Sequence, residues 1–264
     1  MGGSWLVGLG SLLVLGASTG EVLPSAGEAA GATAPGTAAA PPAATPPDLD
    51  QPAPKPTWSC REQPPQPFLI RRNYTPRRGM SDAELRACRQ RHQDAIRYRS
   101  KTYGYFKGFG SPTDNPRTPW QQSTVTTFFG LKVRLHEKVV PALRCVEEEL
   151  RRTCPATPYQ PRQLDGIRPK NSFRGGEVSN HAYGIALDID RDRNPCCGCG
   201  GNLRNHPSCK KPAASIRERT ALPDCWIEVF ARFGFHWLGD DPLQDTMHFE
   251  FLGDPAQVLG PAVP

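Results

Sequence analysis

Two short stretches in the second half of the chain alternate apolar and polar residues, which is the pattern of half-buried β-strands. The apolar positions are Ile185, Leu187 and Ile189 in the first stretch and Met247, Phe249 and Phe251 in the second. We expect these side chains to face a core. Asp188 and His248 then point to the opposite face, each from a rigid strand.

Three other stretches have the spacing of amphipathic helices. A helix from about 82 to 99 follows the capping-box sequence Ser81-Asp-Ala-Glu84. A second helix is expected from Glu137 to Arg152, with Pro141 tolerable only near its start. A third is expected from Pro223 to Phe233. The expected inward residues are Val139, Leu143, Val146 and Leu150 in the second helix and Trp226, Val229, Phe230 and Phe233 in the third. This predicts an α+β fold, with a small, mostly antiparallel sheet and helices packed on one side.

The polar faces of the two strands predict a metal site. His181 and Asp188 are seven residues apart, which is over about 20 Å on an extended chain, so sharing one ion requires a reversal that Gly184 can supply. With His248 they form a set of two histidines and one aspartate. Zinc prefers four ligands, so this set leaves one position open for water, as in catalytic sites. The other histidines are expected to be structural or surface residues: His92, His136, His206 and His236.

Two motifs resemble a known family. Ser-x-His-x-x-Gly-x-Ala-x-Asp at 179–188 is followed by Gly234-Phe-His-Trp237 and by Asp-x-Met-His-Phe-Glu at 245–250. The order and spacing resemble the zinc D-alanyl-D-alanine carboxypeptidases and L-alanyl-D-glutamate endopeptidases that cut peptidoglycan stem peptides. The resemblance covers roughly Glu137 to Gly253.

The resemblance implies roles for particular residues. His181, Asp188 and His248 would hold zinc, and Asp245 would be the general acid-base. Arg174, in Asn171-Ser-Phe-Arg174, would hold a substrate carboxylate or stabilise the oxyanion, although the aromatic residue follows Ser directly here, unlike in the family. Substrate contacts would come from Trp237, as a wall of the cleft, and from Ser179, the first residue of the first motif.

The N-terminal region indicates export. Residues 1–20 lack charged side chains and contain an apolar run of about twelve residues, which suits a signal peptide and is too short to span a bilayer. Residues 21–57 are rich in Ala, Pro and Gly, as expected of a disordered linker. We expect residues 58–136 to extend the catalytic domain at its N-terminus. Residues 137–264 would form the zinc peptidase core, with a Cys-rich insert at 194–209.

Nine cysteines support an oxidising compartment. Cys145 is expected to pair with Cys154, and Cys60 with Cys88. Cysteines of the insert are expected to form a disulfide-stapled loop, with Cys225 as a further partner, although a second, structural metal site in the insert stays an alternative. The odd total leaves at least one thiol without an intramolecular partner.

The net charge of +6 is spread along the chain, which does not favour nucleic acid as a partner. We expect no integral membrane span after signal removal, a secreted or periplasmic location at the cell wall, and a peptidoglycan peptide as the substrate. Three alternatives stay open. In the first, the substrate is a different exported peptide. In the second, the chain is a non-catalytic zinc-containing module for wall binding or signalling. In the third, the site is vestigial in a wall-associated protein.

Overall fold

The computed structural model describes residues 58–156, 159–169 and 178–261. The predicted signal peptide, the predicted linker and Arg174 lie outside these residues. Residues 54–264 belong to one compact unit. The boundary expected between residues 136 and 137 stays a prediction.

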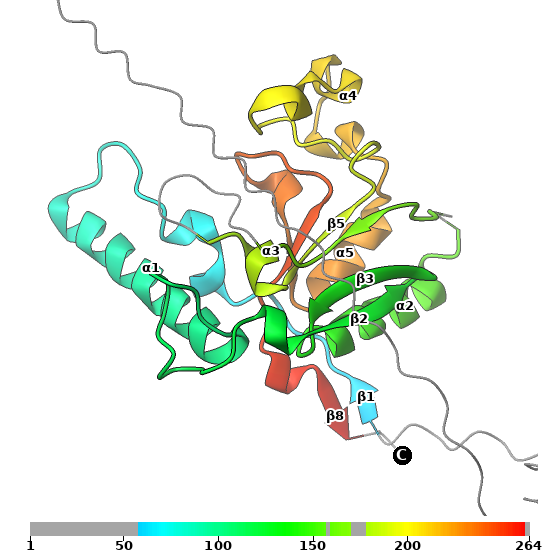
Figure 1. The fold of residues 1–264 in the computed structure, drawn as a ribbon. Helices are drawn as coiled ribbons and strands as arrows, with labels where there is room; N and C mark the ends of the chain where they lie inside the picture. The colour runs from blue at the N-terminus through cyan, green and yellow to red at the C-terminus, as the bar shows by residue number, and fades with distance from the viewer. Residues whose placement is uncertain (1–57, 157–158, 170–177, 262–264) are drawn as a thin grey trace, which may run out of the picture. The chain divides into compact units, whose positions relative to one another are not determined.

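A four-stranded antiparallel sheet is the centre of this unit (Figure 1). Its strands, in spatial order, are β4 (Leu164–Asp165), β5 (Ala186–Ile189), β7 (His248–Phe251) and β6 (Phe235–Trp237). Both predicted strands are therefore present, at the two central positions of the sheet. The prediction of an α+β fold with a small antiparallel sheet is confirmed.

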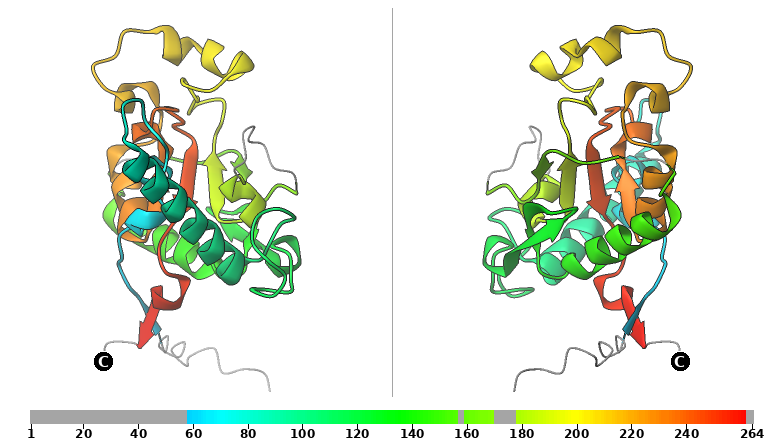
Figure 2. Two further views of the ribbon diagram at one scale, coloured as in Figure 1. Left: turned by 90° about the vertical axis from the view of Figure 1, so that its left-hand side faces the viewer. Right: turned by 90° about the vertical axis from the view of Figure 1, so that its right-hand side faces the viewer.

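The helices α2 (Val140–Thr153) and α5 (Asp224–Arg232) pack together beside this sheet (Figure 2). All eight helix residues predicted to face inward belong to one buried cluster, which also contains Leu187 and Phe249 from the sheet. Helix α2 begins three residues later than predicted, so Pro141 lies in the first turn, where its missing N–H costs no hydrogen bond. The core thus lies on one face of β5 and β7.

Helix α1 (Asp82–Tyr103) extends beyond the predicted end at residue 99. Its N-terminus has the predicted capping box, in which the Ser81 hydroxyl accepts from the Glu84 N–H and the Glu84 carboxylate accepts from the Ser81 N–H. One buried face of α1 packs on a second cluster that contains Leu69, Tyr74 and Leu252. Residues 69–74 are thereby held next to the end of β7.

The remaining elements surround this core. They are the hairpin β2 (Ser123–Phe128) and β3 (Leu131–His136), the strand pair β1 (Trp58–Cys60) and β8 (Leu259–Pro261), and the four-residue helices α3 (Asn180–Tyr183) and α4 (Pro207–Lys210). The insert with α4 and the β1–β8 pair lie at opposite ends of the unit (Figures 1 and 2). None of the helices in the described ranges is both long and apolar enough to cross a bilayer.

Four disulfides join eight of the nine cysteines. They are Cys60–Cys145, Cys154–Cys225, Cys196–Cys199 and Cys197–Cys209. The last two confirm the stapled insert and leave no thiolate there for a structural metal.

Three predicted pairings were wrong. Cys145 and Cys154 are nine residues apart along α2 and its C-terminal end, a rise of about 13 Å, which exceeds the Cα separation that a disulfide spans. Cys88, expected to pair with Cys60, is buried on α1 as a free thiol. Cys225 lies on α5 and joins Cys154 at the end of α2, not the insert.

This connectivity predicts the result of a thiol titration. Unfolded, unreduced protein should react with one equivalent of a thiol reagent, and the native protein with almost none, because Cys88 is buried. Peptide mapping should place the label at Cys88. Five or more reactive thiols would contradict the disulfide framework.

The buried residue His136 predicts a loss of stability in acid. Burial, followed by the nearby Lys138 charge, lowers its pKa to about 4. In the unfolded chain this histidine has a pKa near 6.5 and takes up a proton that the native state excludes. The contribution of His136 to the free energy of unfolding is therefore fully present above pH 6.5 and is lost as the pH falls toward 4. The loss amounts to roughly 3 kcal/mol over that window.

Denaturant unfolding of His136→Asn between pH 7 and pH 4.5 tests this. The variant should lose part of the wild-type pH dependence, even if its stability at pH 7 is lower. His206→Asn, in the insert, should keep the wild-type slope. Comparing the variants with wild type cancels the acid sensitivity of the other histidines. If the free energy of unfolding of His136→Asn depends on pH as steeply as that of wild type, His136 is not the source of the acid sensitivity.

Candidate metal centre

The register of the central strands places two predicted ligands side by side. Asp188 in β5 pairs directly with His248 in β7. Their neighbours Leu187 and Phe249 also pair, and both belong to the core. Because side chains alternate along a strand, Asp188 and His248 must share the face that points away from this core.

A single turn of helix brings the third ligand to the same face. The Ser179 hydroxyl caps α3 by accepting from the His181 N–H at 3.3 Å. Gly184 ends α3 in the left-handed conformation, with φ of 71°, and leads into β5. A Cβ atom at residue 184 would lie 2.8 Å from the His136 backbone nitrogen. Glycine therefore supplies the predicted reversal between His181 and Asp188.

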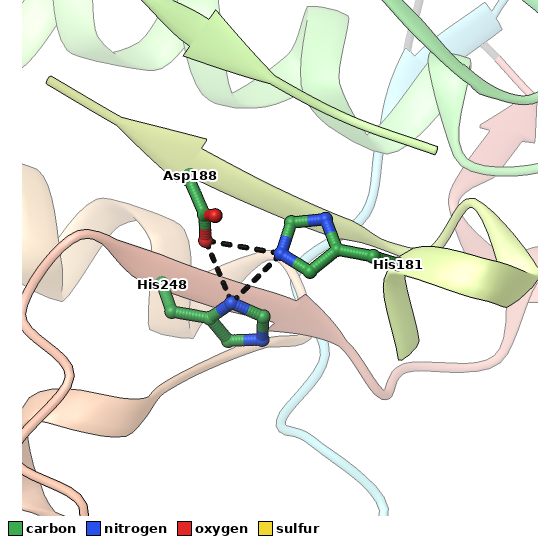
Figure 3. Close-up of side chains that lie close together, drawn as sticks. All are labelled: His181, Asp188 and His248. Carbon is green, nitrogen blue, oxygen red and sulfur yellow. Dashed lines mark hydrogen bonds and ion pairs between the residues drawn. The ribbon is translucent and has the colours of Figure 1, made fainter. Parts of the chain in front are cut away.

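Three ligand atoms converge from these residues (Figure 3). His181 Nε2 lies 3.0 Å from His248 Nδ1 and 3.1 Å from Asp188 Oδ1, and His248 Nδ1 lies 2.7 Å from Asp188 Oδ1. Ligand atoms around a four-coordinate zinc ion are separated by roughly 3.3 Å, given metal–ligand distances of about 2.0–2.1 Å. The triangle therefore fits a small cation.

The outer contacts of the two imidazoles decide their tautomers. His181 Nδ1 is 2.7 Å from the Gly166 carbonyl oxygen, and His248 Nε2 is 3.1 Å from Glu250 Oε1. Both partners only accept, so these nitrogens carry protons, and each ring in its neutral form would turn a lone pair inward. With Asp188, the neutral rings would then place three electron-rich atoms opposite one another. Such an arrangement calls for a cation.

The two histidines differ in ionisation when no cation is bound. Burial lowers the pKa of His248, but the adjacent carboxylates of Asp188 and Glu250 outweigh this effect and raise that pKa well above its usual value. Binding of a cation would therefore displace a proton from His248. Burial lowers the pKa of His181, which favours the neutral ring. Burial opposes ionisation of Asp188, but the adjacent His248 and His181 hold the pKa of its carboxyl well below the usual range. Metal ligands of these types must be deprotonated.

Two further residues hold the ligands in place. Arg168 Nη2 contacts Asp188 Oδ2 at 3.1 Å, which leaves Oδ1 for the metal. Glu250 orients the ring of His248. Neither role was predicted from the sequence. For Glu250 the period-two spacing from His248 on one strand was an available indication, whereas Arg168 is distant from Asp188 along the chain.

Asp245 lies in the turn before β7, three residues from His248. Burial, opposed by the charge of His248 and aided by that of Asp188, raises its pKa to about 6. Its Oδ1 atom is buried without a hydrogen-bond partner among the described residues. The nearby sulfurs of Cys196 and Cys199 are joined to each other and offer no second metal site. These properties are compatible with a general base, and the catalytic role of Asp245 stays a prediction.

The remaining predicted site residues differ in what the structure shows of them. Trp237 in β6 is buried, and its Nε1 donates to the Thr246 carbonyl at 2.8 Å, which holds the turn that carries Asp245. Ser179 is the buried cap of α3. A substrate contact by either residue stays a prediction. Arg174 lies outside the described residues.

One family model matches the segment that contains this site. Residues 174–251 match the model described as D-alanyl-D-alanine carboxypeptidase. This part of the chain is similar to that family. The match contains the three ligands together with Asp245 and Glu250, and it confirms the resemblance that the two motifs predicted. Searches of curated proteins and of solved structures returned no match.

The carboxypeptidase family assignment implies a metal-dependent peptidase, and the His–Asp–His triangle supplies a place for the metal. The matched segment begins at residue 174. Helix α1 and the β2–β3 hairpin therefore lie outside it, although the hairpin contributes Phe128 and Leu135 to the same core as the sheet.

Proposed function

We propose that the chain is an exported zinc peptidase that hydrolyses a peptide bond in peptidoglycan stem peptides, of the D-alanyl-D-alanine carboxypeptidase type. The observation that carries this proposal is the convergence of two imidazole nitrogens and one carboxylate inside a family-matched segment. Two His and one Asp with an open position suit catalytic zinc.

His181, Asp188 and His248 would hold the ion, while Arg168 and Glu250 keep the ligands oriented. When bound, zinc supplies Lewis-acid chemistry that polarises a carbonyl group and lowers the pKa of a water molecule. Asp245 would accept a proton from the attacking water at a carboxylate oxygen and deliver it to the nitrogen of the leaving amine. Arg174 would hold a substrate carboxylate or the developing oxyanion, since its fork is bidentate toward oxyanions.

The proposed location is secreted or periplasmic, at the cell wall. Four disulfides support the part of this proposal that places the chain outside the reducing cytosol. This compartment is also where peptidoglycan is found. The oxidising compartment that the disulfides indicate is therefore also the compartment of the family's substrate.

Incubation with muropeptides, followed by mass spectrometry of the products, tests the function. Loss of the terminal alanine from a pentapeptide stem is the expected result, and a chelator should abolish it while added zinc restores it. Cleavage between L-alanine and D-glutamate would instead identify an endopeptidase. Intact muropeptides after incubation with a folded, zinc-loaded protein would leave a non-catalytic module or a different exported peptide as the substrate.

A further inference from the structure

A cavity of about 330 Å³ borders the metal centre at Glu250, the residue that accepts the hydrogen bond of His248 Nε2. Its volume lies within the range of small-ligand sites. One wall comes from residues 71–99, outside the family match, and the other from residues 178–250. The N-terminal segment therefore builds half of a pocket one side chain away from a candidate metal ligand.

Positive charge predominates in this cavity. Its arginines are Arg71, Arg72, Arg77 and Arg99, against two carboxylates, Asp241 and Glu250. Glu250 interacts with both His248 and Arg99, so its charge is divided between the imidazole and the guanidinium. In the described lining, four guanidinium groups stand against two carboxylates, and this excess of positive charge favours an anionic ligand.

The arginines differ in how they are held. Arg99 is buried, and its guanidinium donates to the Leu69 carbonyl at 2.9 Å and to the Tyr74 hydroxyl at 3.4 Å. Arg72 and Arg77, in contrast, are exposed to solvent. In the described part of the chain no carboxylate forms an ion pair with Arg72. This guanidinium is therefore available for bidentate contact with an incoming carboxylate.

The opposite wall offers apolar surface and hydrogen-bond acceptors. Leu238 and Leu243 line it together with Asn180 and Asp241. Asn180 and Asp241 each keep one buried side-chain oxygen without a hydrogen-bond partner among the described residues. Buried acceptors are normally paired, and a ligand N–H could supply the partner after a small side-chain rotation. A carboxylate, an N–H group and a short apolar body together describe the end of a peptide.

We propose that this cavity binds the carboxylate-bearing end of a peptide, with Arg72 and Arg77 holding the carboxylate, which leaves Arg174 the role at the developing oxyanion. The choice of a peptide rests on the proposed function, whereas the preference for a carboxylate rests on the arginines alone. The segment before residue 174 thereby contributes to substrate selection in a way that the family motifs do not encode.

Isothermal titration calorimetry with two matched probes, N-acetyl-D-alanine and its C-terminal primary amide, tests the site. The probes differ in the charged group, and their L-enantiomers are run alongside. Full-length, chelator-treated protein is used at about 150 mM salt, so that neither a metal nor weak long-range attraction holds the acid. The acid should bind at least about tenfold more tightly than the amide, because charge-assisted hydrogen bonds are roughly twice as strong as neutral ones.

The double variant Arg72→Gln, Arg77→Gln should remove this preference. The control Arg86→Gln, Arg89→Gln changes two exposed arginines of α1 that do not line the cavity, and it should keep the preference. Equal binding of acid and amide, a preference that survives in the first double variant, or absence of binding to the folded protein would each overturn the proposal. No hydrolysis is measured, so failure of this site and failure of the proposed peptidase activity are separate results.

Discussion

His181→Ala should abolish zinc binding and hydrolysis together. The variant removes one of the three candidate ligand atoms. Only His248 and Asp188 remain, and two protein ligands are too few for a stable zinc site. Wild-type protein should carry about one zinc ion per chain, and the variant close to none. Metal analysis after gel filtration, together with turnover of a pentapeptide muropeptide, gives both values.

The matched control is His206→Ala. His206 caps the short helix α4 through its Nδ1, which accepts from the Ser208 N–H, and its Nε2 lies 2.9 Å from the Asp192 carbonyl. This variant should retain zinc and turnover even if the insert becomes less stable. Zinc retained in His181→Ala would refute the proposed ligand set, and zinc lost in His206→Ala would move attention to the insert.

Asp245→Asn should separate chemistry from metal binding. The amide has nearly the same size as the carboxyl group but cannot accept the proton, so turnover should fall by roughly 10²- to 10⁴-fold, the usual contribution of a general acid-base. Zinc content should not change, because Asp245 is outside the ligand triangle.

The melting temperature of Asp245→Asn should be unchanged or higher at pH 7. A carboxyl group whose pKa is raised in the native state binds its proton more tightly there than in the unfolded chain. Its ionisation therefore costs stability above about pH 6, and the amide avoids that cost. Asp240→Asn, at an exposed neighbouring position, is the control and should behave as wild type in all three measurements.

Near-normal turnover of zinc-loaded Asp245→Asn would show that Asp245 is not the base. Glu250 would be a poor replacement, since its carboxylate is bound to His248 Nε2 and the neighbouring charge lowers its pKa to about 2 against the effect of burial. Glu177 would then be the next residue to test, although it lies outside the described residues.

Local patterns predicted most of the elements around the site. The alternation at 185–190 and 247–251 identified both central strands, because a sheet buried on one face requires that alternation. Helices α1, α2 and α5 followed from capping and apolar spacing. Strand β5 ends at Ile189, one residue before the end of the alternating stretch, because the backbone of Asp190 turns to φ of 46°. Its buried carboxylate there accepts from the Arg162 and Gln163 N–H groups, a contact between segments that no local pattern encodes.

Disulfide connectivity was the clearest failure of prediction from spacing. Cys145 and Cys154 are near in sequence, but the continuous helix between them holds them apart. Cys60 and Cys145 are 85 residues apart in sequence, and the fold brings their Cα atoms to 5.6 Å. Sequence distance does not measure spatial distance once an element is rigid.

By itself, the sequence determined which residues are the candidate ligands, His181, Asp188 and His248. It also identified Gly184 as the reversal between them and placed Asp245 outside the strand. Only the tertiary structure decided which atoms face inward, since the tautomers depend on the Gly166 carbonyl and on Glu250. It also brought Arg168 to Asp188 and placed Arg72 and Arg77 in a cavity with Glu250. The physical reason is that propensity and periodicity act over a few residues, whereas hydrogen-bond partners and cavities arise from packing between segments far apart in the chain.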